Sequence, residues 1–325
     1  MKARTFESGP RPRIGISSCL LGQKVRFDGG HKRDAFLVET FGQFIEWVAV
    51  CPEVELGLGT PRETLRLVRR DSGIRMVNNK TGDDISDAMR AWADRRVAAL
   101  SKMDLSGYVL KKDSPSCGME RVKVYGDAPG SMPARSGRGL FAEILMARLP
   151  DLPVEEEGRL QDPRLRENFV ERVFAYVRLK AFFAGRWTVG GLVEFHTAHK
   201  LTLLAHSPEM YRELGHLVAG AKGMERPDLE RRYRGGFMRA LSLIATARKH
   251  ANVLMHIAGY FKRTLDAASR QELLSSIEDY RRGLVPLIVP LTLVRHHVRR
   301  TGEGYLRGQV YLDPHPKELM LRNHV

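Results

Sequence analysis

The hydrophobic pattern of this chain changes character about half-way along. Up to about residue 160, short apolar runs typical of β-strands alternate with segments of helical spacing, such as residues 86–100. From Pro163 onward this alternation stops and long helical patterns take over. Strands that alternate with helices predict a mostly parallel sheet. We therefore expect a Rossmann-like α/β domain over residues 10–185, followed by an all-α domain over residues 190–325.

Two further segments carry a local prediction. Residues 126–139 are rich in Gly, Pro and Ser, which predicts a surface loop. Apolar residues recur at steps of three and four from Phe237 to Leu265, and this stripe predicts a long helix with a buried face. Glycines loosen the helical pattern near residues 184–191, which is where we place the junction between the domains.

The chain has three cysteines, and each follows a predicted strand closely. The pairs of strand and cysteine are 13–17 with Cys19, 47–50 with Cys51, and 107–110 with Cys117. Ligands of open α/β sheets gather outside the carboxyl ends of the strands, so these distant residues are expected to converge. Three soft thiolates at one point favour a metal or an iron–sulfur cluster.

Other readings of the cysteines remain open. They could be three buried thiols that merely end strands, which is the common situation for a single cysteine. Structural zinc is a weaker alternative because the chain has no paired Cys-x-x-Cys hooks. A nucleophilic cysteine would need a histidine, and His31 is the only one before residue 185. A small, odd number of cysteines argues against a disulfide framework.

The charge of the chain indicates a polyanionic partner. The sequence has 53 Lys and Arg against 38 Asp and Glu, a formal charge of +15, and nucleic acid is the first candidate. After residue 188 there are 21 basic and 13 acidic residues, and residues 231–265 hold eight basic residues and no acid. A solvated helical face would explain that cluster equally well. There is no apolar run of 18 residues and no signal-peptide core, so we expect a cytoplasmic protein without a membrane segment.

Short motifs surround the cysteines. They are Ser18-Cys19-Leu20-Leu21-Gly22, Cys51-Pro52-Glu53 and Ser114-Pro115-Ser116-Cys117-Gly118. Three thiolates can hold a 4Fe–4S cluster and leave one iron open as a Lewis acid. Glu53 and Ser114 are near enough in sequence to reach a substrate there, and Glu53 could act as an acid or base. Asp28 and Lys112 are candidate substrate-binding residues, although surface salt bridges would also explain them.

These motifs resemble the thiouracil desulfidase family, whose members bind a 4Fe–4S cluster through three cysteines. The resemblance covers roughly the first half of the chain. In the second half, residues 195–200 and 311–319 resemble a domain of unknown function that is often fused to it. The two-domain form is similar to the bacterial tRNA 4-thiouridine desulfidases.

The resemblance implies a non-redox hydrolytic desulfuration of 4-thiouridine in tRNA to uridine. Sulfur would be captured by the open iron and released as hydrogen sulfide, while water adds to C4. The implied cluster ligands are Cys19, Cys51 and Cys117, with Glu53 and Ser114 as catalytic residues. The helical domain would bind the tRNA. No obligate protein partner is predicted.

Three alternative functions stay open. The same chemistry could act on a free thiolated pyrimidine base such as thiouracil. The protein could instead be a non-catalytic iron–sulfur protein that binds RNA or senses redox state. The reverse reaction, sulfur insertion, is disfavoured because the chain has no phosphate-binding loop of the Gly-x-x-x-x-Gly-Lys type to activate the uridine oxygen.

Two features have no part in this chemistry. His196 and His199 lie three apart and could resemble a metal pair, but no third ligand is evident and we interpret them as packed or hydrogen-bonded histidines. Glu55 follows Glu53 closely and has no assigned role.

Overall fold

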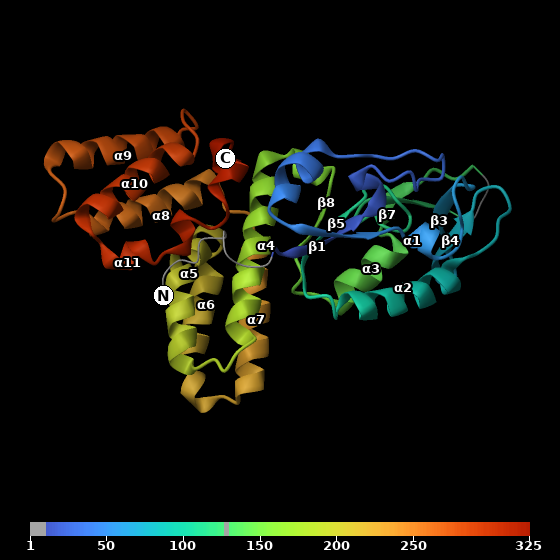
Figure 1. Cartoon of the computed structure of the whole chain (residues 1–325), viewed down its shortest axis with the longest axis horizontal. Coiled ribbons are helices and arrows are strands. Elements are labelled where there is room, and N and C mark those ends of the chain that lie inside the picture. Colours follow the sequence, from blue (N-terminus) through green and yellow to red (C-terminus); the bar gives the residue numbers. More distant parts are fainter. Residues whose placement is uncertain (1–10, 127–129) are drawn as a thin grey trace. The chain divides into compact units, whose positions relative to one another are not determined.

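The computed structural model describes residues 11–126 and 130–325, and the chain divides into two units (Figure 1). The first, which we name the sheet unit, runs from Arg11 to Gln161; the second, the helical unit, contains Asp162–Val325. This boundary precedes the junction that the sequence predicted at residues 184–191. The reason is α4 (Pro163–Phe183), which begins at its own cap, where the Asp162 side chain accepts from two backbone amides, and packs against α7 (Arg226–Ser242). Residue 10, the predicted start of the first domain, lies outside the described residues.

The sheet unit is built on a four-stranded parallel sheet. Its strand order is β2-β1-β5-β8, with β1 at Arg13–Ser17, β2 at Glu46–Val50, β5 at Leu105–Leu110 and β8 at Val154–Glu156. β1 pairs on one side with β2 and on the other with β5. Gly15 is required at the centre, because a Cβ there would lie 2.1 Å from the Tyr108 ring on β5. The predicted parallel α/β architecture is confirmed.

Helices cover this sheet and supply its core. α2 (Ser86–Leu100) and α3 (Leu140–Arg148) lie side by side (Figure 1). The Phe141 ring of α3 contacts both Trp92 of α2, at 5.6 Å between ring centroids, and Tyr108, at 5.8 Å. Shorter helical turns complete the unit: η1 (Ser18–Leu21), η2 (Phe36–Thr40), η3 (Phe41–Gln43), α1 (Pro52–Glu55) and η4 (Arg159–Gln161).

A second four-stranded sheet was not predicted from the sequence. Its order is β4-β3-β6-β7, with β3 at Leu65–Arg70, β4 at Gly73–Asn78, β6 at Val122–Tyr125 and β7 at Ala134–Gly137. The surface loop predicted at residues 126–139 is therefore partly wrong, because β7 pairs antiparallel with β6 inside that range. β7 is short and polar, so its composition does not favour a strand. Pairing with β6 stabilises the extended conformation instead. Residues 127–129 lie outside the described residues.

The helical unit contains only helices among its described residues, as predicted. After α4 come α5 (Val189–His206), α6 (Pro208–Ala219), α7, α8 (Ala247–Tyr260), α9 (Ala267–Arg281), α10 (Ile288–Thr301) and α11 (Gly304–Arg307), with short turns η5 (Ala221–Gly223), η6 (Val310–Leu312), η7 (Lys317–Leu319) and η8 (Leu321–Asn323). No helix in the described part of the chain is long and apolar enough to cross a membrane.

The long helix predicted from Phe237 to Leu265 is instead two helices. α7 ends at Ser242, Leu243 is extended, and Thr246 caps the start of α8 with its side-chain oxygen. The carbonyl of Leu243 is bound by the His206 ring at 2.6 Å, and Ile244 is 40% exposed. The regular apolar spacing thus continues across the connection between α7 and α8, and for this reason the sequence pattern did not reveal the break.

Candidate functional site

The three cysteines lie at the carboxyl ends of three neighbouring strands. Cys51 follows β2, Cys19 follows β1, and Cys117 follows β5 after a short loop, and these strands are adjacent in the order β2-β1-β5. All three strands are parallel, so these ends meet at one edge of the sheet. The predicted convergence at that edge is present in the structure.

Cys19 is held inside a tight turn. It lies in η1, which ends at Gly22 in the left-handed conformation with φ 92°. The Cys19 carbonyl accepts from the amide of Gly22 at 3.3 Å and from that of Lys32 at 2.9 Å. Only 8% of the residue is exposed. The turn therefore fixes the thiol just beyond the end of β1.

Cys51 occupies the position before the first turn of α1. Pro52 is the first helical residue, where its missing N–H costs nothing. The amides of Val54 and Glu53 point at the Cys51 sulfur and favour its thiolate. Glu55, which had no predicted role, accepts from the Cys51 amide at 3.3 Å and pairs with Arg96 at 3.0 Å. Glu55 thus holds the backbone of this cysteine.

Cys117 belongs to a loop whose backbone is fixed by hydrogen bonds to Ser114 and from the first turn of α3. The Ser114 Oγ accepts from the Ser116 amide at 3.2 Å and from the Cys117 amide at 3.1 Å. The first turn of α3 supports the loop, since the amides of Phe141 and Ala142 both donate to the Ser116 carbonyl. Gly139 precedes that turn, and a Cβ there would lie 2.4 Å from the Ser116 carbonyl.

The three cysteines form no disulfide and are electrostatically coupled; Cys19 and Cys117 are buried and Cys51 is half-buried. Burial raises the pKa of Cys19 to about 11, although the Lys111 ammonium works against this shift. Burial likewise raises the pKa of Cys51 and, more strongly, that of Cys117, where a hydrogen bond from Ser17 opposes it. The proximity of the other thiols adds to the raised pKa of Cys19 and of Cys117. Without a metal the site therefore holds neutral thiols, and a cation would stabilise three thiolates at once.

The arrangement also limits what kind of metal fits. Among residues 11–126 and 130–325, no three His, Cys, Asp or Glu side chains are grouped closely enough to hold a single ion. An all-sulfur donor set selects soft metals or iron–sulfur clusters over calcium and magnesium. Three electrostatically coupled thiols therefore fit a soft metal or an iron–sulfur cluster.

Glu53 lies beside the cysteines with both carboxylate oxygens occupied. Its Oε2 accepts from the Arg62 Nε at 2.9 Å and Nη2 at 2.5 Å, and its Oε1 accepts from the Ser116 hydroxyl at 2.8 Å. Glu53 also influences the ionisation of Cys117. Sequence reasoning found Glu53 but missed both partners, because Arg62 lies outside the motifs and Ser116 seemed secondary to Ser114.

The other predicted site residues, Ser114, Asp28 and Lys112, make contacts that do not involve Glu53. Ser114 supports the Cys117 loop with its oxygen, as described above. The Asp28 carboxylate is half-exposed at 49%, accepts from the Gly30 amide at 2.9 Å, and lies 3.5 Å from Arg26. The Gly30 amide is the main cause of the lowered pKa of Asp28. Lys112 is exposed, and its backbone amide donates to Glu157.

Lys111, the neighbour of Lys112, is the lysine nearer to the cysteines. Its ammonium lies 2.5 Å from Glu157, and the two side chains are only 13% and 12% exposed. It is also the charge that acts most strongly on Cys19. The signal that could have found it is its position as the first residue after β5, where the carboxyl edge of the sheet begins.

The histidine pair of the helical unit is packed, as predicted. His196 binds the Tyr233 hydroxyl at 3.2 Å, and the His199 ring binds the Phe195 carbonyl at 2.8 Å. Burial lowers the pKa of His196 to about 4 and that of His199 to about 3. Both rings are therefore neutral hydrogen-bonding groups in the core.

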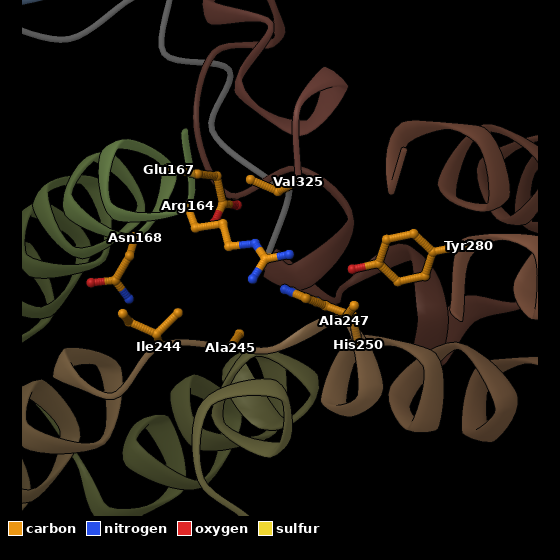
Figure 2. Close-up of a pocket in the computed structure, with 9 residues that line it drawn as sticks. All are labelled: Arg164, Glu167, Asn168, Ile244, Ala245, Ala247, His250, Tyr280 and Val325. Atoms are coloured by element: carbon orange, nitrogen blue, oxygen red, sulfur yellow. The ribbon is translucent and has the colours of Figure 1, made fainter. Parts of the chain in front are cut away.

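The helical unit also contains a small polar pocket (Figure 2). Glu167 and Arg164 of α4, His250 of α8 and Tyr280 of α9 line it. Its volume is about 20 Å³, which is room for about one water. A nucleobase does not fit in a volume of this size.

Comparison with known proteins assigns both parts of the chain. Residues 14–157 match the family model described as 2-thiouracil desulfurase. Residues 200–316 match a family of unknown function, DUF1722. The protein YbgA of Escherichia coli (strain K12), which is uncharacterized, is 36% identical over 161 residues, covering 49% of this chain and 95% of YbgA. The chain carries a 2-thiouracil desulfurase domain and is a relative of YbgA. The family resemblance drawn from the three motifs is confirmed.

Two further proteins are similar to this relative of YbgA over a shorter span. The uncharacterized protein YbbK of Bacillus subtilis (strain 168) is 28% identical over 110 residues, covering 32% of this chain and 72% of YbbK. A solved structure titled [4Fe-4S]-dependent thiouracil desulfidase TudS is 28% identical, with a TM-score of 0.38, and covers 46% of this chain and 94% of that one.

Proposed function

We propose that this protein is a desulfidase that hydrolyses 4-thiouridine in tRNA to uridine, using a 4Fe–4S cluster held by three cysteines. One observation carries the proposal: three electrostatically coupled thiols, two of them buried and one half-buried, follow adjacent strand ends inside a 2-thiouracil desulfurase domain. The proposal also places the protein in the cytoplasm.

Cys19, Cys51 and Cys117 would hold the cluster. The donor set fits, because it is entirely sulfur and because amides near Cys51 and the Ser17 hydroxyl near Cys117 supply hydrogen bonds to sulfur. When bound, the cluster would supply an iron without a protein ligand, a Lewis acid that accepts the thiocarbonyl sulfur.

The protein's own groups would then handle the proton transfers. Net hydrolysis converts C=S and one water into C=O and hydrogen sulfide, so both protons of the water end on sulfur. Glu53 would accept one proton from the water as the water oxygen bonds to C4, and the second from the resulting C4 hydroxyl as the C–S bond breaks, and would pass each proton to the departing sulfur. Ser114 already accepts two amide bonds, which leaves its hydroxyl hydrogen to donate to the base. Asp28 and Lys112 would contact the substrate from the rim.

The polymeric substrate is supported by charge. The formal charge of +15 favours a polyanion, and the helical unit offers exposed basic side chains such as Arg239. Part of this charge is neutralised within α7, where Arg231 and Arg232 pair with Asp228 and Arg234 pairs with Glu230. The competing substrate is a free thiolated base, which the description of the matching family favours.

The test is an anaerobic incubation of the iron-loaded protein with tRNA that contains 4-thiouridine, and in parallel with 2-thiouracil. Uridine formed and sulfide released are quantified after digestion to nucleosides. We expect equal amounts of uridine and sulfide from the tRNA, and none with Cys51→Ala.

Two other results would contradict the proposal in different ways. Turnover of 2-thiouracil without turnover of tRNA would make the protein a free-base desulfidase. Inactivity on both, with iron bound and tRNA retained, would make it a non-catalytic iron–sulfur RNA-binding protein.

A further inference from the structure

The Glu53 carboxylate is held by a clamp that no comparison assigns. We define the clamp as Arg62 and Ser116, which together occupy both oxygens of Glu53. Arg62 and Ser116 come from different loops, nine residues after and 63 residues after Glu53. A carboxylate with both oxygens bound has a fixed orientation, whereas an exposed one rotates freely.

Arg62 is itself immobilised. Its Nη1 donates to the carbonyls of Val25 at 3.0 Å and Gly59 at 2.9 Å, and its side chain is 7% exposed. The Val25 carbonyl also lies 3.9 Å from the Cys51 sulfur. The Arg62 guanidinium therefore hydrogen-bonds to the loop after Cys19 through Val25, to the segment after α1 through Gly59, and to Glu53 on α1 itself. Its planar fork suits this task, which a lysine ammonium would not reproduce.

Ser116 links Glu53 to the third cysteine. It is fully buried, and its hydroxyl has one hydrogen, which it donates to Glu53. Its backbone is fixed by Ser114 and by the first turn of α3, and Cys117 is the next residue. Any substrate held at the three cysteines thus meets a carboxylate whose direction is set from the Cys117 side as well as from the Cys51 side.

We propose that Arg62 and Ser116 are positioning residues that fix the orientation of the Glu53 carboxylate for proton transfer at the three-cysteine site. This inference rests on the proposed desulfidase function. A buried ion pair with a merely structural role would contribute to folding and to iron binding. A positioning role instead affects the chemical step, because small displacements of a catalytic group are costly there.

Ser116→Ala is the primary test, because it removes one hydrogen bond and leaves the backbone contacts in place. Its matched control is Ser86→Ala: Ser86 is also fully buried in the sheet unit and donates to a carboxylate, Asp84, at 2.6 Å. Iron and sulfide per chain, the unfolding midpoint, kcat and KM are measured on whichever thiolated substrate the wild type desulfurates. We expect kcat of Ser116→Ala to fall roughly tenfold or more, with iron content and KM within twofold of the wild type.

Arg62→Lys tests the other half of the clamp, with Arg75→Lys as its control. Arg75 forms a comparable fork on Asp87, at 3.0 Å for each bond, away from the cysteines. We expect Arg62→Lys to lower kcat and Arg75→Lys to leave it unchanged. If Arg62→Lys does not fold, Ser116→Ala decides alone. When Glu53→Gln is already present, adding Ser116→Ala should lower kcat little further, because Ser116 acts on catalysis through Glu53.

Three outcomes overturn the inference. The first is an unchanged kcat in Ser116→Ala, and the second is a loss of kcat that follows a loss of iron, which would make the clamp structural. The third is full additivity of Ser116→Ala with Glu53→Gln. The failure of the desulfidase function itself is recognised separately, since the iron-loaded wild type would then release no sulfide from any thiolated base.

Discussion

Individual residues matter most where the backbone leaves no room for a side chain. Gly139 has φ −65° and ψ 142°, an extended conformation that any residue adopts. Its constraint is therefore contact and not backbone strain. A Cβ at this position would lie 2.4 Å from the Ser116 carbonyl and 2.8 Å from the Cys117 amide, and backbone atoms cannot move aside as a flexible side chain can.

Gly139→Ala is accordingly expected to displace the Cys117 loop. We expect it to lower the free energy of unfolding of the sheet unit by about 1–3 kcal/mol, the usual cost of overpacking, and to lower iron bound per chain. Thermal unfolding and iron analysis measure both. Gly185→Ala is the control, because its Cβ would meet nothing within 4 Å. Normal iron content in Gly139→Ala would show that the loop adapts.

At the scale of elements, the helical unit is held together by buried polar groups as well as by apolar faces. Glu167 and Glu171 of α4 are both at least 95% shielded from solvent, and Arg322 near the end of the chain lies 3.1 Å from Glu167. His206, at the end of α5, lies 3.4 Å from Glu171. Burial alone would lower the pKa of His206, but its bond with Glu171 outweighs this and raises it. Such groups are stabilising only while every partner keeps its charge state.

His199 of α5 makes the helical unit sensitive to acid. Its Nδ1 donates to the Phe195 carbonyl and its Nε2 accepts from Arg178 at 3.3 Å, so the ring has no place for a second proton. Burial lowers its pKa to about 3, below the value of about 6.5 in the unfolded chain. The contribution of neutral His199 to the free energy of unfolding is therefore present above pH 6.5 and is lost as the pH falls from there toward 3.

We expect His199→Gln to weaken this dependence. Between pH 6.5 and pH 5 the free energy of unfolding should fall by about 1–2 kcal/mol less than in the wild type, since one proton is worth about 1.4 kcal/mol per pH unit. Calorimetric unfolding across this range measures the difference. The exposed His216→Gln should keep the wild-type slope. His206 acts in the opposite direction, because its contribution is present below pH 6.5 and is lost as the pH rises through its raised pKa.

At the scale of the whole molecule, the excess of basic residues separates the two candidate substrates. A tRNA bound through phosphates releases counterions, so its affinity falls steeply as salt rises. A free base carries no phosphate. The charge of +15 therefore predicts a strong salt dependence of KM for tRNA and almost none for the free base.

Raising salt from about 50 to about 200 mM should increase KM for tRNA by one or more orders of magnitude, if several phosphates are contacted. KM for 2-thiouracil should stay within about twofold under the same conditions. Initial-rate measurements on both substrates give the comparison. Equal responses would mean that the basic surface does not bind the nucleic acid.

Sequence reasoning predicted the parts of this structure that depend on local pattern. The parallel sheet, the helix at residues 86–100 and the convergence of the cysteines follow from apolar runs and from the geometry of strand ends. The second sheet did not, because β3 has the sequence Leu-Arg-Leu-Val-Arg-Arg and β7 is polar, so neither reads as a strand without its partners. Arg62 was missed for a similar reason: its role depends on where its side chain ends, which spacing along the chain does not reveal.

The order in which this site can be made follows from the placement of its cysteines on three parallel strands. β1 and β5 pair directly, yet more than eighty residues separate Ser17 from Leu105, and Cys117 lies further on. During synthesis on the ribosome, the first two cysteines emerge long before the third strand exists to align them. If the three cysteines hold the proposed cluster, its loading has to follow folding of the whole sheet unit, and a truncated or newly emerging chain would offer scavenged iron no complete set of the proposed ligands.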